Sequence, residues 1–240
     1  MERSTVILLG AGKGTRMGSG VRKQYMELDG MPLLAYSLKT FTECPFLTDI
    51  VMIIPEGEEE YVRRHIIDAV PGAEEKIRAL VPGGSERYGS VYNGIRAIDW
   101  PCGYVFIHDG ARPFIDRASL ERLYEAVQKE GAVIAGMPSK DTVRITDADG
   151  YSDTTPDRSR VWIIQTPQVF EKQLITDAYE GMMRALPELE RQGVKITDDG
   201  QAVEQILGKK VRMVEASYRN IKITTPEDLL TAKAFTEENV

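Results

Sequence analysis

The chain has 240 residues, of which 42% are hydrophobic and 28% charged, which is typical of a globular protein with a buried core. Its 30 Lys and Arg against 37 Asp and Glu give a net charge of −7, so no overall positive field attracts DNA or RNA. The two cysteines and two histidines lack the spacing of a zinc site, and no apolar stretch is long enough to span a membrane.

Short continuous apolar runs predict strands that are buried on both faces, as in parallel sheets. They occupy residues 5–9, 50–54, 104–107 and 132–135. Helical periodicity appears between them, in residues 33–41 and again from Asp116, where Leu120, Leu123 and Val127 share one face. Strands that alternate with helices predict an α/β fold with a Rossmann-like, doubly wound and mostly parallel sheet.

Residues 137–163 break this alternation, because they are polar and lack helical periodicity. The sequence Asp-Ala-Asp-Gly at 147–150 lies between two extended pieces and predicts a protruding β-hairpin arm. Further on, Thr225 followed by Pro226 and two acids predicts the start of a helix. Since no linker or repeat interrupts residues 1–240, we expect a single domain that carries this arm.

A glycine loop, GAGKGTRMG at residues 10–18, directly follows the first predicted strand. Glycines at this place let backbone N–H groups approach phosphates. The loop does not match the dinucleotide-binding fingerprint, because Thr15 stands where that motif has its third glycine. It does not match a P-loop either, because Ile7 stands where that motif has its first glycine. Basic residues nevertheless gather here in an acidic chain, namely Lys13, Arg16, Arg22 and Lys23. They favour a triphosphate ligand over the alternative of a turn with solvated side chains.

This loop, together with Lys-Gln-Tyr at 23–25, resembles the signature of sugar-phosphate nucleotidyltransferases, and its Lys-Gln-Tyr form is similar to the methylerythritol phosphate cytidylyltransferases of isoprenoid biosynthesis. Further motifs follow in the family's order, at residues 83–91, 108–113, 140–142, 166–168, 197–199 and 220–224. Each is weak alone, but together they are specific and span nearly the whole chain. The departures, Gly10, Arg22 and Gly110, remove no functional side chain.

The resemblance implies that CMP is transferred from CTP to the phosphate of 2-C-methyl-D-erythritol 4-phosphate, a polyol phosphate, with release of pyrophosphate. The attacking phosphate oxygen is already an anion, so catalysis consists of positioning and charge stabilisation and needs no general base. We assign the catalytic charges to Arg16 and Lys23. Mg²⁺, bound mainly through the CTP phosphates, is the expected cofactor.

Nucleotide binding is predicted for the two glycine-containing segments. By resemblance, the second segment reads the cytosine edge through backbone groups and a hydroxyl, which would discriminate against uracil. Capping of a helix that runs to Ile98 is the alternative role for Ser85 and Ser90. The predicted nucleotide-binding residues are Gly10, Ala11, Gly12, Gly14, Gly83, Gly84, Ser85 and Ser90.

Acceptor binding is predicted around Asp109, which follows a strand at the sheet edge where ligands bind. Its carboxylate also suits Mg²⁺, while a turn cap is the structural alternative. Lys222 lies in a strand-like run, 221–223, whose lysine would otherwise simply face solvent. By resemblance, the acceptor-binding residues are Asp109, Arg112, Thr142, Arg158, Thr166 and Lys222.

A homodimer is expected, in which two arms clasp each other about a twofold axis. The resemblance implies that Arg158 of one subunit reaches the acceptor bound by the other; alternatively, it solvates an exposed strand. Neither nucleic acid nor membrane is an expected partner. The scattered thiols and the absence of a signal-peptide pattern predict a cytoplasmic protein.

Three other functions stay open on the sequence. A ribitol 5-phosphate cytidylyltransferase would share the loop and the mechanism. An NAD-dependent oxidoreductase is disfavoured by the missing third glycine. A non-catalytic relative would be expected to lack Arg16, Lys23 or Asp109, and all three are present. His65 and His108 have no partners for a catalytic triad and receive no catalytic role.

Overall fold

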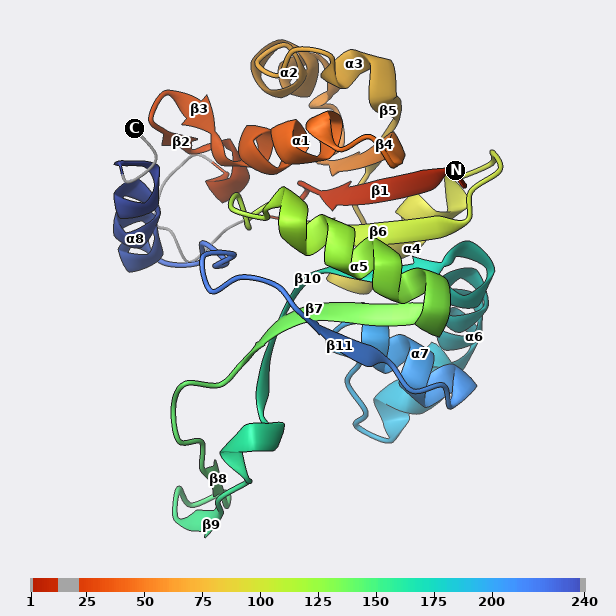
Figure 1. Ribbon diagram of the computed structural model, residues 1–240. Helices are drawn as coiled ribbons and strands as arrows, with labels where there is room; N and C mark the ends of the chain where they lie inside the picture. The colour runs from red at the N-terminus through yellow and green to blue at the C-terminus, as the bar shows by residue number, and fades with distance from the viewer. Residues whose placement is uncertain (1, 13–21, 238–240) are drawn as a thin grey trace.

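The computed structural model describes residues 2–12 and 22–237. A seven-stranded sheet runs through it in the order β11-β7-β10-β6-β1-β4-β5 (Figure 1). β10 is antiparallel to both of its neighbours, and the other pairs are parallel. The strands are β1 Ser4–Leu9, β4 Leu47–Ile54, β5 Ile77–Pro82, β6 Tyr104–Asp109, β7 Ala132–Pro138, β10 Trp162–Glu171 and β11 Arg212–Glu215. The predicted mostly parallel sheet is therefore confirmed.

Helices cover both faces of this sheet, as a doubly wound fold requires. Successive residues of β1 point to opposite faces: Val6 and Leu8 join the core cluster under α1 and α5, whereas Ile7 joins the one under α4, α6 and α7. All three side chains are fully buried, which explains the continuous apolar run. The main helices are α1 Leu33–Glu43, α4 Arg87–Arg96, α5 Arg117–Glu130, α6 Lys172–Arg191 and α7 Asp199–Leu207.

Smaller elements complete the α1 side of the sheet and the C-terminal end. The π-helical turn η3, Arg63–Ile67, contributes Ile66 and Ile67 to the core cluster under α1. α8 contributes Ala232 to a separate small cluster with Leu28 of β2. These elements are η2 Lys23–Tyr25, β2 Glu27–Leu28, β3 Met31–Pro32, α2 Glu59–Val62, α3 Ala73–Lys76 and α8 Pro226–Glu237. None of the described helices combines the length and the apolar character that a membrane span requires.

Local signals in the sequence locate two helix starts correctly. Asp116 caps α5, with its Oδ1 accepting the Ser119 N–H at 2.7 Å, and α8 begins at Pro226 as predicted. The strand-like interpretation of residues 221–223 was wrong. This segment pairs with no strand; the Ile223 N–H instead donates to the carbonyl of Ala111 at 2.8 Å. β11 has already ended at Glu215, so the segment leaves the sheet and crosses the strand ends.

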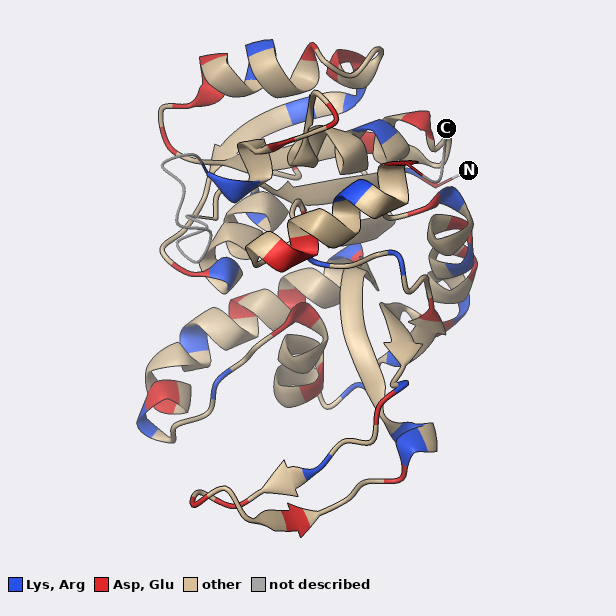
Figure 2. Ribbon diagram, turned by 90° about the vertical axis from the view of Figure 1, so that its left-hand side faces the viewer, with Lys and Arg blue, Asp and Glu red and all other residues tan. Residues whose placement is uncertain are grey.

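The arm leaves the body between β7 and β10 and carries β8, Ile145–Thr146, and β9, Ser152–Thr154 (Figure 1). These strands form the predicted antiparallel hairpin, and Asp147 Oδ1 accepts the N–H groups of Asp149 and Tyr151 in its turn. The returning limb contains the 3-10 turn η4, Arg158–Arg160. Both signs of charge occur along the arm (Figure 2). Tyr151 is 75% exposed near its tip, which is unusual for a large aromatic side chain.

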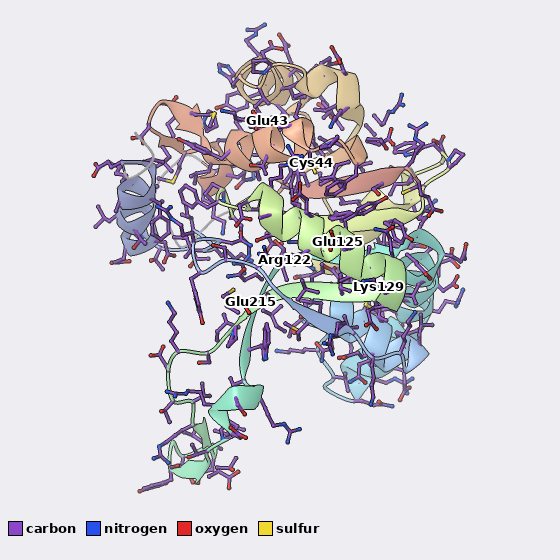
Figure 3. The ribbon with its side chains drawn as sticks, viewed as in Figure 1. Glu43, Cys44, Arg122, Glu125, Lys129 and Glu215 are labelled. Atoms are coloured by element: carbon purple, nitrogen blue, oxygen red, sulfur yellow. The ribbon has the colours of Figure 1, made fainter. Side chains whose placement is uncertain are left out.

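Arg122 of α5 holds the chain where it leaves β11. Its Nε donates to the carbonyl of Glu215 at 2.9 Å, and its Nη2 donates to that of Ala216 at 3.0 Å (Figure 3). The segment that follows β11 and carries Lys222 therefore starts from a fixed point on the sheet.

Candidate active site

A cavity of about 340 Å³ opens where β1, β4 and β6 end. Leu9, Ile53 and Asp109 contribute to its wall from these three strands, at the sheet edge where open α/β folds bind ligands. Of the predicted site residues it brings together Ala11, Gly12, Lys23, Gly84, Ser85, Ser90, Asp109 and Lys222. Gly14 and Arg16 lie outside the described residues.

The start of the glycine loop is held close to the sheet. The Gly10 N–H donates to the carbonyl of Ile53 at 2.7 Å, and a Cβ on Gly10 would lie 2.8 Å from Leu34 Cδ2. Gln24 reaches back from η2, where its buried Nε2 donates to the carbonyls of Gly10 and, at 2.9 Å, Gly12. Gln24 therefore holds residues 10–12, the start of the loop, beside the cavity.

The segment that follows β5 folds against the start of α4. Ser90 is buried, and its Oγ accepts the Gly84 N–H at 3.0 Å. Close backbone approach requires both glycines: a Cβ on Gly83 would lie 2.4 Å from the Ala11 Cβ, and one on Gly84 would lie 2.8 Å from the Gly89 carbonyl carbon. The capping alternative for Ser85 was wrong, because Glu86 is the N-cap of α4 and no side chain caps it.

Asp109 lies between two cations. Its Oδ1 accepts from Arg87 Nε at 3.2 Å, and its Oδ2 accepts from Lys222 Nζ at 2.7 Å. Burial alone would raise the pKa of Asp109, but the charges of Arg87 and Lys222 outweigh burial and hold this pKa well below its ordinary value. The carboxylate is therefore ionised at neutral pH.

His108, to which no catalytic role was assigned, is a buried structural link behind Asp109. The Arg112 carbonyl, 3.1 Å from His108 Nε2, can only accept, so Nε2 carries the proton and Nδ1 accepts from the Thr166 hydroxyl at 3.1 Å. Burial lowers the pKa of His108 to about 4, which keeps the ring neutral. Thr166 Oγ1 in turn accepts the Asp109 N–H at 3.0 Å, so this hydroxyl links His108 to the backbone of Asp109.

Arg112 lines a second cavity, of about 390 Å³, which shares Lys222 with the first. Its Nη1 donates to the carbonyl of Asn220 at 2.8 Å, whereas its Nε is buried and makes no hydrogen bond within the described structure. A buried, unsatisfied guanidinium N–H suits an anionic ligand. Lys140, at the base of the arm, lines the same cavity.

Thr142 and Arg158 do not reach either cavity within one chain. Both are exposed on the arm, and neither lines the two cavities described above. A single chain therefore separates these two residues from the rest of the predicted acceptor site.

Arg87 is the residue that the sequence reasoning missed most clearly. Arg87 lines the cavity at the ends of β1, β4 and β6, and its guanidinium binds Asp109 directly, yet no role was assigned to it within the 83–91 motif. The available signal was an arginine in the first turn of a helix that follows a glycine pair. Gln24 was missed in the same way, although the Lys-Gln-Tyr motif contains it.

A metal ion at this site would need ligands other than protein side chains. No group of three His, Cys, Asp or Glu within residues 2–12 and 22–237 is arranged to hold a metal ion. Asp109 supplies the hard oxygen that Mg²⁺ prefers, and Mg²⁺ commonly binds through one carboxylate and substrate phosphates. The residues present therefore fit a metal ion that arrives with a nucleotide.

Comparison with known proteins identifies the family of this chain. The family model described as 2-C-methyl-D-erythritol 4-phosphate cytidylyltransferase matches residues 4–238. An enzyme of that name from Lachnoclostridium phytofermentans is 44% identical over 239 residues, covering 100% of this chain and 98% of the relative. One from Syntrophotalea carbinolica is 46% identical over 231 residues, covering 96% and 94%.

Solved structures of enzymes with this activity match the fold of the chain as well. The crystal structure of 4-diphosphocytidyl-2C-methyl-D-erythritol synthase from Anaerococcus prevotii matches with a TM-score of 0.83 and 34% identity, covering 98% of this chain and 96% of the other. The 2-C-methyl-D-erythritol 4-phosphate cytidylyltransferase of Francisella tularensis matches with a TM-score of 0.76 and 28% identity, covering 97% and 99%.

Proposed function

This chain belongs to the 2-C-methyl-D-erythritol 4-phosphate cytidylyltransferase family, and we propose that it carries out the family's reaction at the cavity between β1, β4 and β6. It is a nucleotidyltransferase that moves CMP from CTP to the phosphate of 2-C-methyl-D-erythritol 4-phosphate in isoprenoid biosynthesis. The observation that carries the placement is the convergence of both glycine segments, Lys23, Asp109 and Lys222 on one cavity.

In the proposed reaction, a phosphate oxygen of the acceptor attacks the α-phosphorus of CTP. A new P–O bond forms as the bond to the β-phosphate oxygen breaks, and pyrophosphate leaves. The nucleophile is already an anion, so the protein must chiefly align two polyanions and offset their repulsion. We assign this offset to Lys23, beside the cavity, and to Arg16, which lies outside the described residues.

CTP is proposed to lie along the two glycine segments. Ala11, Gly12 and Gly14 would bring backbone N–H groups to its phosphates, whereas Gly10, whose N–H already donates to Ile53, would contribute by having no side chain. The segment from Gly83 to Ser90 would hold the cytosine. Asp109 would offer a carboxylate oxygen to Mg²⁺ bound mainly through the phosphates, and the ion would supply charge neutralisation on the triphosphate.

The acceptor is proposed to bind across Lys222, between the two cavities that this residue lines. Arg112 Nε offers a buried donor there, and Asp109 an ionised carboxylate. Thr166 would act through Asp109, whose N–H it accepts. Thr142 and Arg158 would come from the arm of a second subunit, which also explains the exposed Tyr151 and makes the protein a homodimer.

The single-domain organisation of residues 1–240, the dimerisation role of the arm and a cytoplasmic location remain predictions. Cys44 and Cys102 are free thiols.

The choice of nucleotide tests the proposed function directly. With 2-C-methyl-D-erythritol 4-phosphate as acceptor, CTP should support pyrophosphate release at least about 100-fold faster than UTP, because polar contacts to the base edge discriminate strongly. Initial rates at equal nucleotide concentrations give this ratio. Equal rates with UTP would remove the cytosine pocket from the segment between Gly83 and Ser90.

The choice of acceptor is a separate prediction. We expect a higher kcat/KM for 2-C-methyl-D-erythritol 4-phosphate than for ribitol 5-phosphate, because the family match covers residues 4–238. Each acceptor is assayed alone with saturating CTP. A kcat/KM that is equal or higher with ribitol 5-phosphate would reassign the acceptor and leave the reaction type unchanged.

A further inference from the structure

Arg87 bridges two carboxylates that lie in different parts of the fold. Its Nη1 and Nη2 donate to Oδ1 and Oδ2 of Asp199, each at 2.8 Å, while its Nε donates to Asp109 Oδ1 at 3.2 Å. The pair with Asp199 has the forked geometry that fixes a guanidinium in orientation as well as in place. Asp199 is fully buried and does not line the cavity at the ends of β1, β4 and β6, so it acts on that cavity through Arg87.

Asp199 is itself held from behind. The Tyr179 hydroxyl of α6 donates to Asp199 Oδ1 at 2.5 Å, and both side chains are almost completely buried. Asp199 also stands in the first turn of α7, where the helix dipole favours a negative charge. The Gly200 N–H donates to Gln168 Oε1 of β10 at 2.8 Å, which ties that turn to the sheet. α6 and α7 pack side by side behind the sheet (Figure 1).

The pKa values of Arg87 and Tyr179 are both shifted within this network. Burial alone would lower the pKa of Arg87, but the charges of Asp199 and Asp109 keep it well above its ordinary value. Burial and the neighbouring Asp199 charge raise the pKa of Tyr179 well above its ordinary value, so the phenol stays protonated and acts as the donor. With Lys222, the cluster contains two cations and two carboxylates.

We propose that Asp199 and Tyr179 are positioning residues for the acceptor end of the site. They hold the fork of Arg87 so that only its Nε reaches Asp109, which leaves the second oxygen of Asp109 to Lys222. Without Asp199, Arg87 would turn its fork onto Asp109 and compete with Lys222 for that carboxylate. This inference rests on the proposed function, in which Asp109 and Lys222 contact the acceptor.

Three variants test it: Asp199→Asn, Tyr179→Phe and the control Asp49→Asn. Asp49 is an equally buried aspartate that pairs with two arginines, Arg3 and Arg78, but it lies near the start of β4, away from the cavity. Thermal melting of all three variants measures how much each substitution destabilises the fold, separately from any effect on catalysis.

We expect Asp199→Asn to lower kcat/KM for the acceptor roughly 100-fold, as displacement of a positioning group by about 1 Å can do, with KM for CTP unchanged within about twofold. Tyr179→Phe should lower kcat/KM for the acceptor roughly tenfold, which is the effect of losing one hydrogen bond to a charged group. Asp49→Asn should lower the melting temperature without changing kcat/KM. If Asp199→Asn and Asp49→Asn lose stability alike and both keep wild-type kcat/KM for the acceptor, the proposal is wrong.

A crystal structure of the Asp199→Asn variant supplies a readout that does not depend on activity. We expect Nη1 and Nη2 of Arg87 to have turned to the carboxylate of Asp109 and Lys222 Nζ to have been displaced from it. An unmoved Arg87 would overturn the proposal. If Asp199→Asn fails to fold, the kinetics of Tyr179→Phe decide the question, and an unchanged kcat/KM for the acceptor would overturn the proposal. Wild-type enzyme that releases no pyrophosphate from CTP and 2-C-methyl-D-erythritol 4-phosphate would refute the proposed function instead, while the position of Arg87 still tests the network.

Discussion

Lys23→Ala is expected to lower kcat by roughly 100- to 1,000-fold, the cost of removing one electrostatic contact to a transition state. Lys23 lies beside the cavity at the start of η2, where its charge would act on the phosphates as negative charge builds up. Steady-state pyrophosphate release with saturating CTP and acceptor measures this effect. The same loss is expected for Arg16→Ala, at a position outside the described residues.

Lys23 also makes a structural contact, which the experiment must separate from its charge. Its Nζ donates to the carbonyl of Ile223 at 3.2 Å, next to Lys222. Lys23→Gln keeps a donor at this position but removes the charge, so it should be almost as slow as Lys23→Ala. Lys39→Ala, which removes an exposed lysine from α1, is the matched control and should keep normal turnover. Near-normal turnover of Lys23→Gln would show that the charge of Lys23 is not catalytic.

Mixing two inactive variants is expected to restore activity if the site is shared between subunits. Arg158→Ala and Lys23→Ala should each be nearly inactive as homodimers. In a mixed dimer, one site carries both defects and the other carries neither, because Arg158 acts at its partner's site. Each mixed dimer should therefore recover roughly half of the wild-type activity per dimer.

A site that is not shared between subunits predicts a different result of mixing. If Arg158 serves its own subunit, every site in a mixed dimer keeps one defect and mixing restores nothing. Subunits with different affinity tags allow the mixed dimers to be purified and counted before the assay. Confirmed exchange without recovery of activity would exclude the shared site and leave the cytidylyltransferase reaction intact.

Much of the fold could be predicted because its signals are local. The run at residues 5–9 predicted β1 because a strand covered on both faces needs apolar side chains at every position. Asp116 predicted the start of α5 because its carboxylate satisfies an N–H group three residues away. Asp147 and Gly150 predicted the hairpin turn, since a side-chain acceptor and a positive φ, 88° at Gly150, are local requirements.

The segment at residues 221–223 shows where local pattern fails. Its alternation fits a strand, but a strand also needs a neighbouring edge, and this one crosses the strand ends after β11 has stopped. This alternation places the polar Lys222 between two apolar residues, of which Ile223 is fully buried. It could not show that the lysine turns inward to Asp109.

The sequence by itself determined the strands β1, β4, β6 and β7, the starts of α5 and α8, the hairpin and the motifs that identify the family, because each depends on residues close together in the chain. Only the tertiary structure decided which charges meet. Arg87 and Asp199 are 112 residues apart, and the sequence does not show which of its charged side chains will be buried beside the other. Ion pairing depends on burial and on distances of a few ångströms, and the packing of α4 and α7 on the sheet sets both.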